Sequence, residues 1–189
     1  MLARLALSVT TATTVAATGC AWRYRQRTLT DPLTGLANRA ALETEFRRRR
    51  RSGPVAVAVG DMNGFKAFND TYGHRFGDQV LIEVARVLAR ETSRGELPVR
   101  LHGDEFAVLL PGVHNQAAAE HRVRQLQDAI AQITAIDGQP VEVSMALGVM
   151  TMPAESADLS RLLGSADDRM YGDKHTNRSR TEIAIPQPQ

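Results

Sequence analysis

The stretch RLHGDEFAVLL at positions 100–110 constrains the fold of this chain more than any other. Two β-type runs, 99–101 and 106–110, meet there around a short turn that carries Asp104 and Glu105. Two carboxylates held about 4 Å apart repel each other by roughly 4 kcal/mol at an intermediate dielectric, so a bound cation would stabilise the pair. Alternatively, neighbouring side chains on a strand point to opposite faces, and one acid is merely solvated.

A second acid follows a strand elsewhere in the chain. Residues 55–60, VAVAVG, form a short apolar run rich in valine, which is typical of a strand buried on both faces, and Asp61 ends it. If this strand lies beside the hairpin, Asp61 and Asp104 converge. Oxygen ligands from two separate elements, with open positions left over, suit Mg²⁺ bound together with substrate phosphates.

Four separated motifs resemble, in the same order, those of the GGDEF diguanylate cyclase domain. They are DPLTGLANR at 31–39, DMNGFKAFNDTYGHRFGD at 61–78, RLHGDEF at 100–106 and SADDRMYGDKHTNR at 165–178. The resemblance implies an Mg²⁺-dependent enzyme that condenses two GTP molecules into cyclic di-GMP, a bacterial second messenger, and releases pyrophosphate. Because each domain would bring one GTP, it also implies a homodimer with two half-sites facing each other.

The resemblance also assigns roles to individual residues. The residues expected to hold Mg²⁺ or Mn²⁺ are Asp61, Met62 through its carbonyl, Asp104 and Glu105. The residues expected to be catalytic are Asp104, Glu105 and Lys66, with Glu105 either completing the metal site or helping to take the proton from the attacking 3′-hydroxyl. The residues expected to contact GTP are Asn63, Gly64, Phe65, Lys66, Asn69, Asp78, Gly103, Lys174 and Arg178.

Asn69 and Asp78 are implied to hold the guanine base. An ionised Asp accepts the two donors on the Watson–Crick edge of guanine, whereas adenine presents one donor and one acceptor. Taken alone, Asp78 would instead cap a helix. Lys174 and Arg178 lie four residues apart near the end of the last helix, where they alone indicate cations favoured by the helix dipole. The resemblance aligns them with residues that grip the triphosphate.

Hydrophobic periodicity and capping signals predict the order of elements. The predicted helices are 40–51, 64–70, 77–92, 116–135 and one capped by Asp158, and the predicted strands are 55–60, 99–101, 106–110, 141–150 and 181–185. This order fits an α+β fold with a central, mostly antiparallel five-stranded sheet flanked by helices, similar to the palm of nucleotide polymerases and cyclases. The length of 189 residues fits one such domain, at 30–186, after a leader at 1–29.

The leader has three interpretations. Residues 5–22 are uncharged and just long enough to span a bilayer, and more arginines follow than precede them, which predicts an inner-membrane anchor with the domain in the cytoplasm. Residues 17–20 loosely resemble a lipobox, which would export the domain away from GTP. In the third interpretation the leader is mistranslated or disordered and the domain is simply cytoplasmic.

Composition excludes two further possibilities. The formal net charge of +2 and the 5% aromatic content argue against a nucleic-acid partner, which would require a basic patch with interleaved aromatics. The single cysteine cannot form an internal disulfide.

Three departures from the family pattern bear on activity. His102 stands where the first glycine of the signature is expected, which predicts backbone strain of about 1 kcal/mol or more and crowding of the nucleotide. Asn63 replaces the second Asp of a DxD motif and keeps its shape and one acceptor. The product-inhibition motif RxxD is replaced by SRGE at 93–96, so feedback by product should be absent or weak.

Two functional classes therefore remain open. An active diguanylate cyclase is favoured by the retained site residues, which are Asp61, Asn69, Asp78, Asp104, Glu105, Lys174 and Arg178. His102 and the lost inhibitory motif favour a catalytically silent GGDEF module that binds GTP or a protein partner.

Overall fold

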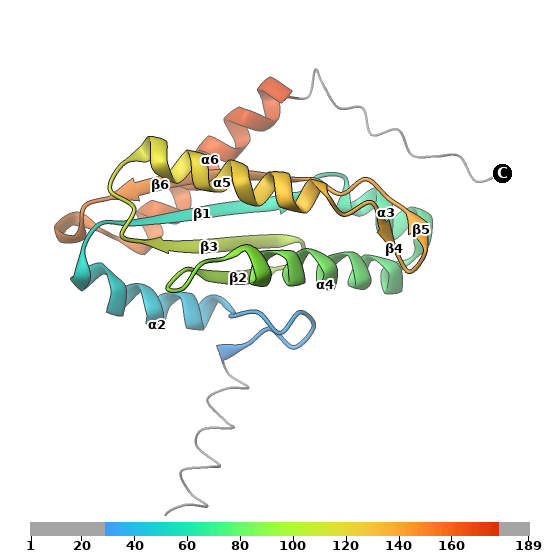
Figure 1. Cartoon of the computed structure of the whole chain (residues 1–189), viewed down its shortest axis with the longest axis horizontal. Helices are drawn as coiled ribbons and strands as arrows, with labels where there is room; N and C mark the ends of the chain where they lie inside the picture. Colours follow the sequence, from blue (N-terminus) through green and yellow to red (C-terminus); the bar gives the residue numbers. More distant parts are fainter. Residues whose placement is uncertain (1–28, 178–189) are drawn as a thin grey trace, which may run out of the picture.

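The computed structural model describes residues 29–177, except for the side chains of Ser52 and of residues 173–177. Its central sheet has the spatial order β2-β3-β1-β6, and every neighbouring pair is antiparallel. The strands are β1 (Val55–Met62), β2 (Leu97–His102), β3 (Glu105–Pro111) and β6 (Met145–Met152). Helices flank this sheet, so the expected α+β fold is confirmed (Figure 1).

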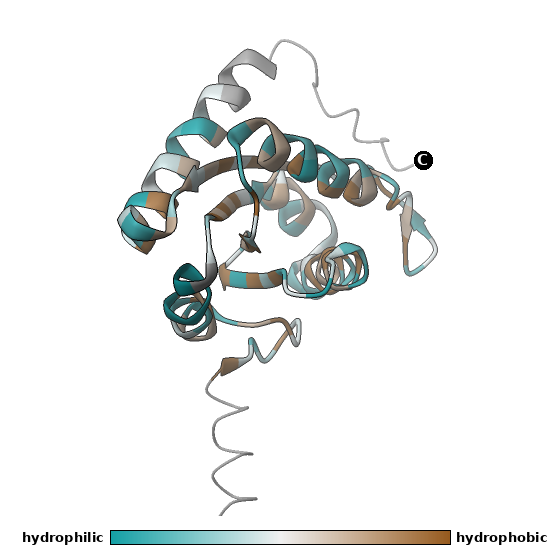
Figure 2. Cartoon of the chain, turned by 60° about the vertical axis from the view of Figure 1, so that its left-hand side comes forward, coloured by the Kyte–Doolittle hydropathy of each residue, from teal (hydrophilic) through white to brown (hydrophobic). Residues whose placement is uncertain are grey.

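The helices form a layer on each face of the sheet. The longer ones are α2 (Arg39–Arg49), α4 (His74–Glu91), α5 (Gln116–Ala131) and α6 (Leu159–Asn177), and a short α3 (Phe65–Tyr72) follows β1. One buried cluster joins α4 and α5 to the sheet, and a second joins α2 and α6 to the opposite face. Figure 2 shows hydrophobic segments on the strands and on the sides of the helices that face them.

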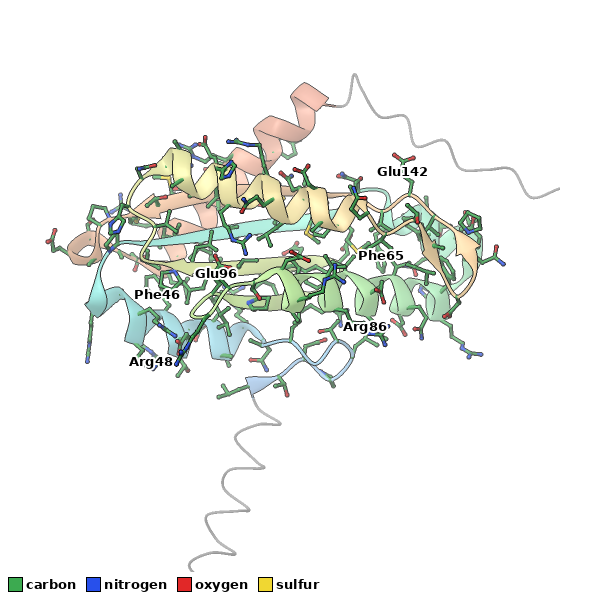
Figure 3. All side chains as sticks on the ribbon, in the orientation of Figure 1. Phe46, Arg48, Phe65, Arg86, Glu96 and Glu142 are labelled. Carbon is green, nitrogen blue, oxygen red and sulfur yellow. The ribbon has the colours of Figure 1, made fainter. Side chains whose placement is uncertain are left out.

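Alternation along β1 explains why both faces are covered. Ala56 and Ala58 belong to the cluster beneath α4 and α5, whereas Val55, Val57 and Val59 belong to the cluster beneath α2 and α6. All these side chains are buried, as expected for a strand with an uninterrupted apolar run. The same division holds on α2 (Figure 3), where Phe46 points to the sheet and Arg48 points to solvent.

The sheet differs from the prediction in its number of strands. Within residues 29–177 the central sheet has four strands rather than five, because the strand predicted at 181–185 lies outside the described residues. β6 is therefore the outer strand of the described sheet. A cavity of about 460 Å³ lies beside residues 147–149 of β6, between α5 and α6.

A small hairpin was missed by periodicity. The helix predicted at 116–135 ends at Ala131, and the strand predicted at 141–150 is Met145–Met152. Between them lie β4 (Ala135–Ile136) and β5 (Gln139–Pro140), joined by Asp137 and Gly138 with φ of 49° and 77°. Positive φ at both central residues is the pattern of a type I′ turn, for which Asp-Gly is a strong signal.

The described helices hold no membrane-spanning segment. None of them is both long and apolar enough to cross a bilayer. The predicted anchor at 5–22 lies outside the described residues and stays a prediction.

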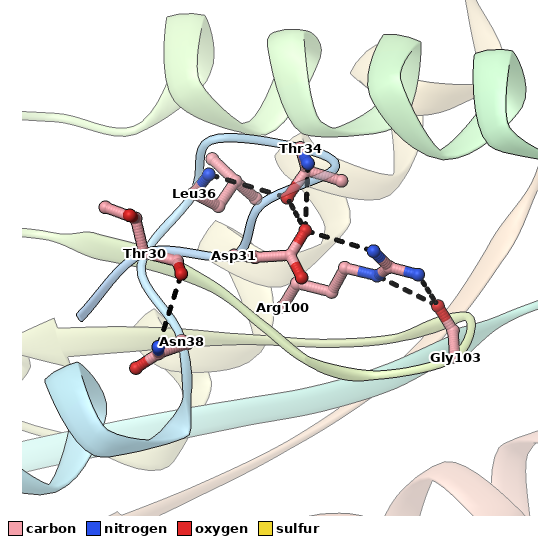
Figure 4. A network of polar contacts seen from close by, with 7 residues as sticks. All are labelled: Thr30, Asp31, Thr34, Leu36, Asn38, Arg100 and Gly103. Atoms are coloured by element: carbon pink, nitrogen blue, oxygen red, sulfur yellow. Dashed lines mark hydrogen bonds and ion pairs between the residues drawn. The ribbon is translucent and has the colours of Figure 1, made fainter. Parts of the chain in front are cut away.

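The loop that precedes α2 docks onto the hairpin (Figure 4). Ala37 bridges Val99 at the outer edge of β2, and the Asp31 carboxylate accepts hydrogen bonds from the Thr34 amide at 2.8 Å and the Thr34 hydroxyl at 2.6 Å. Arg100 Nη1 donates to the same oxygen at 3.0 Å. Burial raises the pKa of Asp31, but the hydrogen bonds from Thr34 and Arg100 outweigh it, so the pKa lies below its ordinary value.

Close contact between α6 and β6 depends on Gly148. A Cβ atom built on this glycine would overlap the backbone of α6 at the Ala166 carbonyl and the Met170 amide. Gly164 in α6 contrasts with it, because nothing lies within 4 Å of its added Cβ. The two glycines therefore make a matched pair, one required by packing and one exposed on a helix.

We expect Gly148→Ala to lower the free energy of unfolding by about 1 to 3 kcal/mol, because α6 must move away from the sheet. Gly164→Ala should instead raise it by about 0.5 to 1 kcal/mol through helix propensity. Urea unfolding of both variants measures the difference. Equal effects of the two substitutions would contradict the described packing.

Asp31→Asn should show a pH-dependent loss of stability. A carboxyl whose pKa is lowered in the folded state stabilises the fold above its unfolded pKa, and this contribution disappears as pH falls through the folded value. We expect the variant to lose about 1 to 2 kcal/mol at pH 7. The loss should shrink as pH falls below the ordinary value of 3.8. Urea titrations at pH 7 and pH 3 measure it, and a loss independent of pH would show that the charge is unimportant.

Candidate active site

Three polar side chains form a row across one end of the sheet. In the strand register, Asp61 of β1 lies opposite Glu105 of β3, and Glu105 lies opposite His102 of β2. Residues directly opposed on antiparallel strands point to the same face, with Cβ atoms about 4.5 to 5.5 Å apart. His102 Nε2 lies 3.2 Å from Glu105 Oε2. By alternation from Val59, this row faces the side of the sheet that α2 and α6 cover.

Asp104 lies in the turn beside this row. The Met62 amide at the end of β1 donates a hydrogen bond to the Asp104 carbonyl oxygen at 3.3 Å, so the turn is attached to the neighbouring strand. The expectation that the strand at 55–60 lies beside the hairpin is thus confirmed, and Asp61, Asp104 and Glu105 lie at the same end of the sheet.

These acids supply only part of a metal site. Among the described residues, no group of three or more His, Cys, Asp or Glu side chains is gathered closely enough to hold an ion. The hard oxygen donors of Asp61, Asp104 and the Met62 backbone suit Mg²⁺ when phosphate oxygens and water complete the coordination. The donor set therefore fits a metal that arrives with a nucleotide.

The predicted backbone strain at His102 is wrong. Asp137 is the only residue other than glycine with positive φ in the described chain, so His102 keeps an ordinary backbone conformation at the end of β2. The left-handed position belongs to Gly103, with φ of 51°. Positive φ at the first turn residue alone is the φ pattern of a type II′ turn. The His102 side chain is 66% exposed and is directed to Glu105.

The segment after β1 turns sharply into α3. Gly64 adopts φ of 67°, a left-handed conformation, and α3 begins at Phe65. The first N–H groups of a helix have no acceptor within it, so Phe65 and Lys66 present donors at this end of the molecule. Lys66 is exposed.

Asn63 is among the residues expected to contact GTP, but its backbone amide is engaged within the chain and is not available to a phosphate. Its N–H donates to the Ser144 carbonyl at 3.0 Å, and its Nδ2 donates to the Ser144 hydroxyl at 2.9 Å. Asn63 therefore ties β1 to the segment before β6. The amides of Gly64 and Phe65 remain as candidates for phosphate binding.

The Asn69 side chain of α3 meets α4 at Gly77, the residue before Asp78. A Cβ atom on Gly77 would overlap Asn69 Oδ1, so the Asn69 side chain lies against the backbone of α4 next to Asp78. Asp78 is exposed. The helix-cap interpretation of Asp78 is wrong, because α4 begins at His74 with Gly73 as its N-cap.

Two predicted phosphate ligands cannot be placed. Lys174 lies in the last turn of α6, but its side chain is not among those described. Arg178 lies outside the described residues.

The residues at the position of the inhibitory motif bind within the chain. Arg122 of α5 donates to both carboxylate oxygens of Glu96, at 2.9 and 2.7 Å, and the Ser93 amide donates to Glu96 at 2.7 Å (Glu96 is labelled in Figure 3). The hydrogen bond to Glu96 raises the pKa of Arg122. The Glu96 carboxylate is thus engaged within the chain, and the expectation of weak or absent feedback by product stays a prediction.

Sequence reasoning missed two charged residues. Arg100 and Asp31 each belong to a quoted motif, yet neither received a role, although the structure joins them to the turn through the Gly103 carbonyl. Their opposite charges, in two separate motifs, were the available signal for an ion pair between them.

Comparison with known proteins places this geometry in a family. The sequence model described as diguanylate cyclase, GGDEF domain, matches residues 28–180. The chain is 36% identical over 166 residues to diguanylate cyclase DgcP of Pseudomonas aeruginosa, and the match covers 85% of this chain and 24% of DgcP. It is 36% identical over 156 residues to diguanylate cyclase DgcN of Escherichia coli, covering 78% of this chain and 37% of DgcN.

The chain thus spans between 24% and 37% of the length of these curated relatives. Its fold is similar to that of the coiled coil and GGDEF domain of DgcB from Caulobacter crescentus, a structure in complex with c-di-GMP. The TM-score is 0.82 at 24% identity, covering 95% of this chain and 98% of that one. The antiparallel sheet with its Gly-Asp-Glu turn is consistent with the family match and with the two relatives. The chain therefore belongs to the GGDEF diguanylate cyclase domain family.

Proposed function

We propose that this protein is an active diguanylate cyclase, a nucleotidyltransferase that condenses two GTP molecules into cyclic di-GMP and releases pyrophosphate. The observation that carries the proposal is the register of β1 and β3. It sets Asp61 opposite Glu105, while the Met62 amide holds the turn at Asp104. Acids from two separate elements at one sheet end suit a metal-bound nucleotide.

In this proposal Asp61, the Met62 carbonyl and Asp104 hold Mg²⁺ or Mn²⁺. The metal supplies charge neutralisation at the phosphates of GTP. Glu105 faces the same side as Asp61, where it either completes the metal site or helps to take the proton from the attacking 3′-hydroxyl.

The phosphates would be held at the start of α3. The amides of Gly64 and Phe65 and the Lys66 ammonium lie at a helix N-terminus, where anions are favoured. Gly103 has no side chain at the turn, so a phosphate can approach its backbone. Lys174 and Arg178 are proposed to join them from the end of α6.

Guanine would be recognised by Asn69 and Asp78. Gly77 lets the Asn69 amide lie against α4 beside the exposed Asp78 carboxylate. A carboxylate accepts both donors on the edge of guanine, which favours GTP over ATP.

Each domain would bind one GTP, so catalysis requires a homodimer in which the 3′-hydroxyl of one nucleotide faces the α-phosphate of the other. We further propose that residues 1–29 anchor the protein in the inner membrane and that the domain at 30–186 faces the cytoplasm, where GTP is available.

The second candidate is a catalytically silent module that binds GTP or a protein partner. The observation that favours it is the contact between His102 and Glu105, since a proposed catalytic carboxylate is engaged by a side chain that replaces glycine.

The direct test incubates the purified dimer with Mg²⁺ and GTP and separates the products by chromatography. We expect cyclic di-GMP from the wild type and a loss of at least about 100-fold in Asp104→Asn, because a metal contributes several kcal/mol to such a transition state. Asp128→Asn, an exposed acid on α5, is the matched control and should retain activity. No product from a demonstrably dimeric sample, with either Mg²⁺ or Mn²⁺, would leave the silent module as the explanation.

A second test concerns the base. We expect Asp78→Asn to weaken GTP binding about tenfold or more and to reduce the preference over ATP, because the amide cannot accept both guanine donors. Gly77→Ala should weaken GTP binding as well, since the added methyl displaces Asn69. Asp70→Asn, an exposed acid on α3, is the control. Calorimetry with both nucleotides measures this, and unchanged selectivity in Asp78→Asn would exclude the proposed base pocket.

A further inference from the structure

The peptide groups on both sides of Asp104 are held by hydrogen bonds. On one side, the Gly103 carbonyl accepts two bonds from Arg100, from Nε at 3.0 Å and from Nη2 at 2.7 Å. On the other side, the Asp104 carbonyl accepts the bond from the Met62 amide. Gly103, the residue before Asp104, has a left-handed backbone conformation. Because the peptide groups before and after Asp104 are both hydrogen-bonded, the backbone orientation of Asp104 is fixed, and with it the direction of its side chain.

Arg100 uses its remaining terminal nitrogen for a third contact. Nη1 donates to Asp31 at 3.0 Å, and the side chains of Arg100 and Asp31 are only 13% and 17% exposed. A guanidinium is rigid and planar, so the hydrogen bonds to the Gly103 carbonyl and to Asp31 are made in a single orientation of the Arg100 side-chain head. The position of Asp31 therefore sets how Arg100 meets the turn.

Asp31 is itself held by its own loop. Besides the two bonds from Thr34, the Asp31 amide donates to the Leu36 carbonyl at 2.8 Å. The loop is closed at its base, because the Asn38 amide donates to the Leu29 carbonyl at 3.0 Å. Asn38 is also the N-cap of α2, and the chain enters the described domain at Leu29. The entry of the chain, the start of α2 and the turn are thus linked through Asp31.

An ordinary stabilising ion pair is the alternative explanation, and the chain offers a comparison. Arg122 and Glu96 form a bidentate pair with side chains 19% and 13% exposed, similar to Arg100 and Asp31. That pair joins α5 to the segment between α4 and β2 and makes no bond to the turn. It therefore provides a control of matched charge and burial.

We propose that Arg100 is a positioning residue for Asp104. We further propose that Asp31 couples this positioning to the docking of the loop at 29–38 onto the hairpin. When the loop is docked on the hairpin, Arg100 holds the turn in place for the metal-bound nucleotide. When the loop is displaced, Arg100 loses its carboxylate partner and the turn loosens. The effect on catalysis rests on the proposed function. The structural step, in which Asp31 affects the attachment of the turn to β1, does not.

The structural step is tested on the full chain by hydrogen exchange of the Met62 amide, which reports attachment of the turn to β1. We expect Asp31→Asn to accelerate this exchange at least about tenfold under native conditions, since local openings are governed by local contacts. Glu96→Gln should leave it unchanged although it removes a comparable ion pair. Unchanged Met62 exchange in Asp31→Asn, or equal acceleration in Glu96→Gln, would overturn the proposal.

The functional step is tested by steady-state kinetics with GTP. Arg100→Lys keeps the charge but cannot bind Gly103 and Asp31 together, and we expect kcat to fall at least about tenfold with KM changed little. Thr34→Val, which removes a bond to Asp31, should lower kcat, and Thr34→Ser, which keeps it, should restore it.

The outcomes separate the two proposals. A wild type that makes no cyclic di-GMP contradicts the proposed function, while Met62 exchange still decides the coupling. An active wild type whose Asp31→Asn variant keeps both kcat and Met62 exchange contradicts the coupling alone.

Discussion

The antiparallel register of β1 between β3 and β6 is the constraint on which the rest of the structure depends. Side chains alternate along a strand, so a slip of one residue would move Val55, Val57 and Val59 to the opposite face and carry Asp61 with them. Both faces of β1 are buried by helices, and each buried valine side chain contributes about 1.5 to 3 kcal/mol. The apolar core therefore sets the position of the polar row at the end of the sheet.

Glycines then allow the surrounding elements to approach this end. Gly64 turns the chain from β1 into α3, Gly77 gives room to the Asn69 side chain, and Gly148 lets α6 contact the backbone of β6. Gly103 supplies the left-handed turn. The polar groups are thus carried by rigid strands and helix ends, and the Arg100 contacts link the turn to the loop before α2.

Sequence patterns predicted the features that depend on local repetition, namely the strand at 55–60, the hairpin and the longer helices. They failed where a contact joins distant residues. Arg100 and Asp31 are 69 positions apart, so no period or spacing links them. The family resemblance implied that Asn63 contacts GTP, whereas its amide donates to the Ser144 carbonyl, 81 positions away. The left-handed backbone whose strain was predicted for His102 lies instead at Gly103, where the missing side chain avoids that strain.

The central proposal is that Asp61 and Asp104, from two neighbouring elements, share one metal ion that arrives with GTP. The most direct test is a crystal structure of the protein with Mn²⁺ and a non-hydrolysable GTP analogue, located by anomalous scattering. We expect an Mn²⁺ peak within about 2.5 Å of a carboxylate oxygen from each residue and of a phosphate oxygen. An ion bound to the nucleotide alone, or carboxylates of Asp61 and Asp104 too far apart to share it, would contradict this shared metal site.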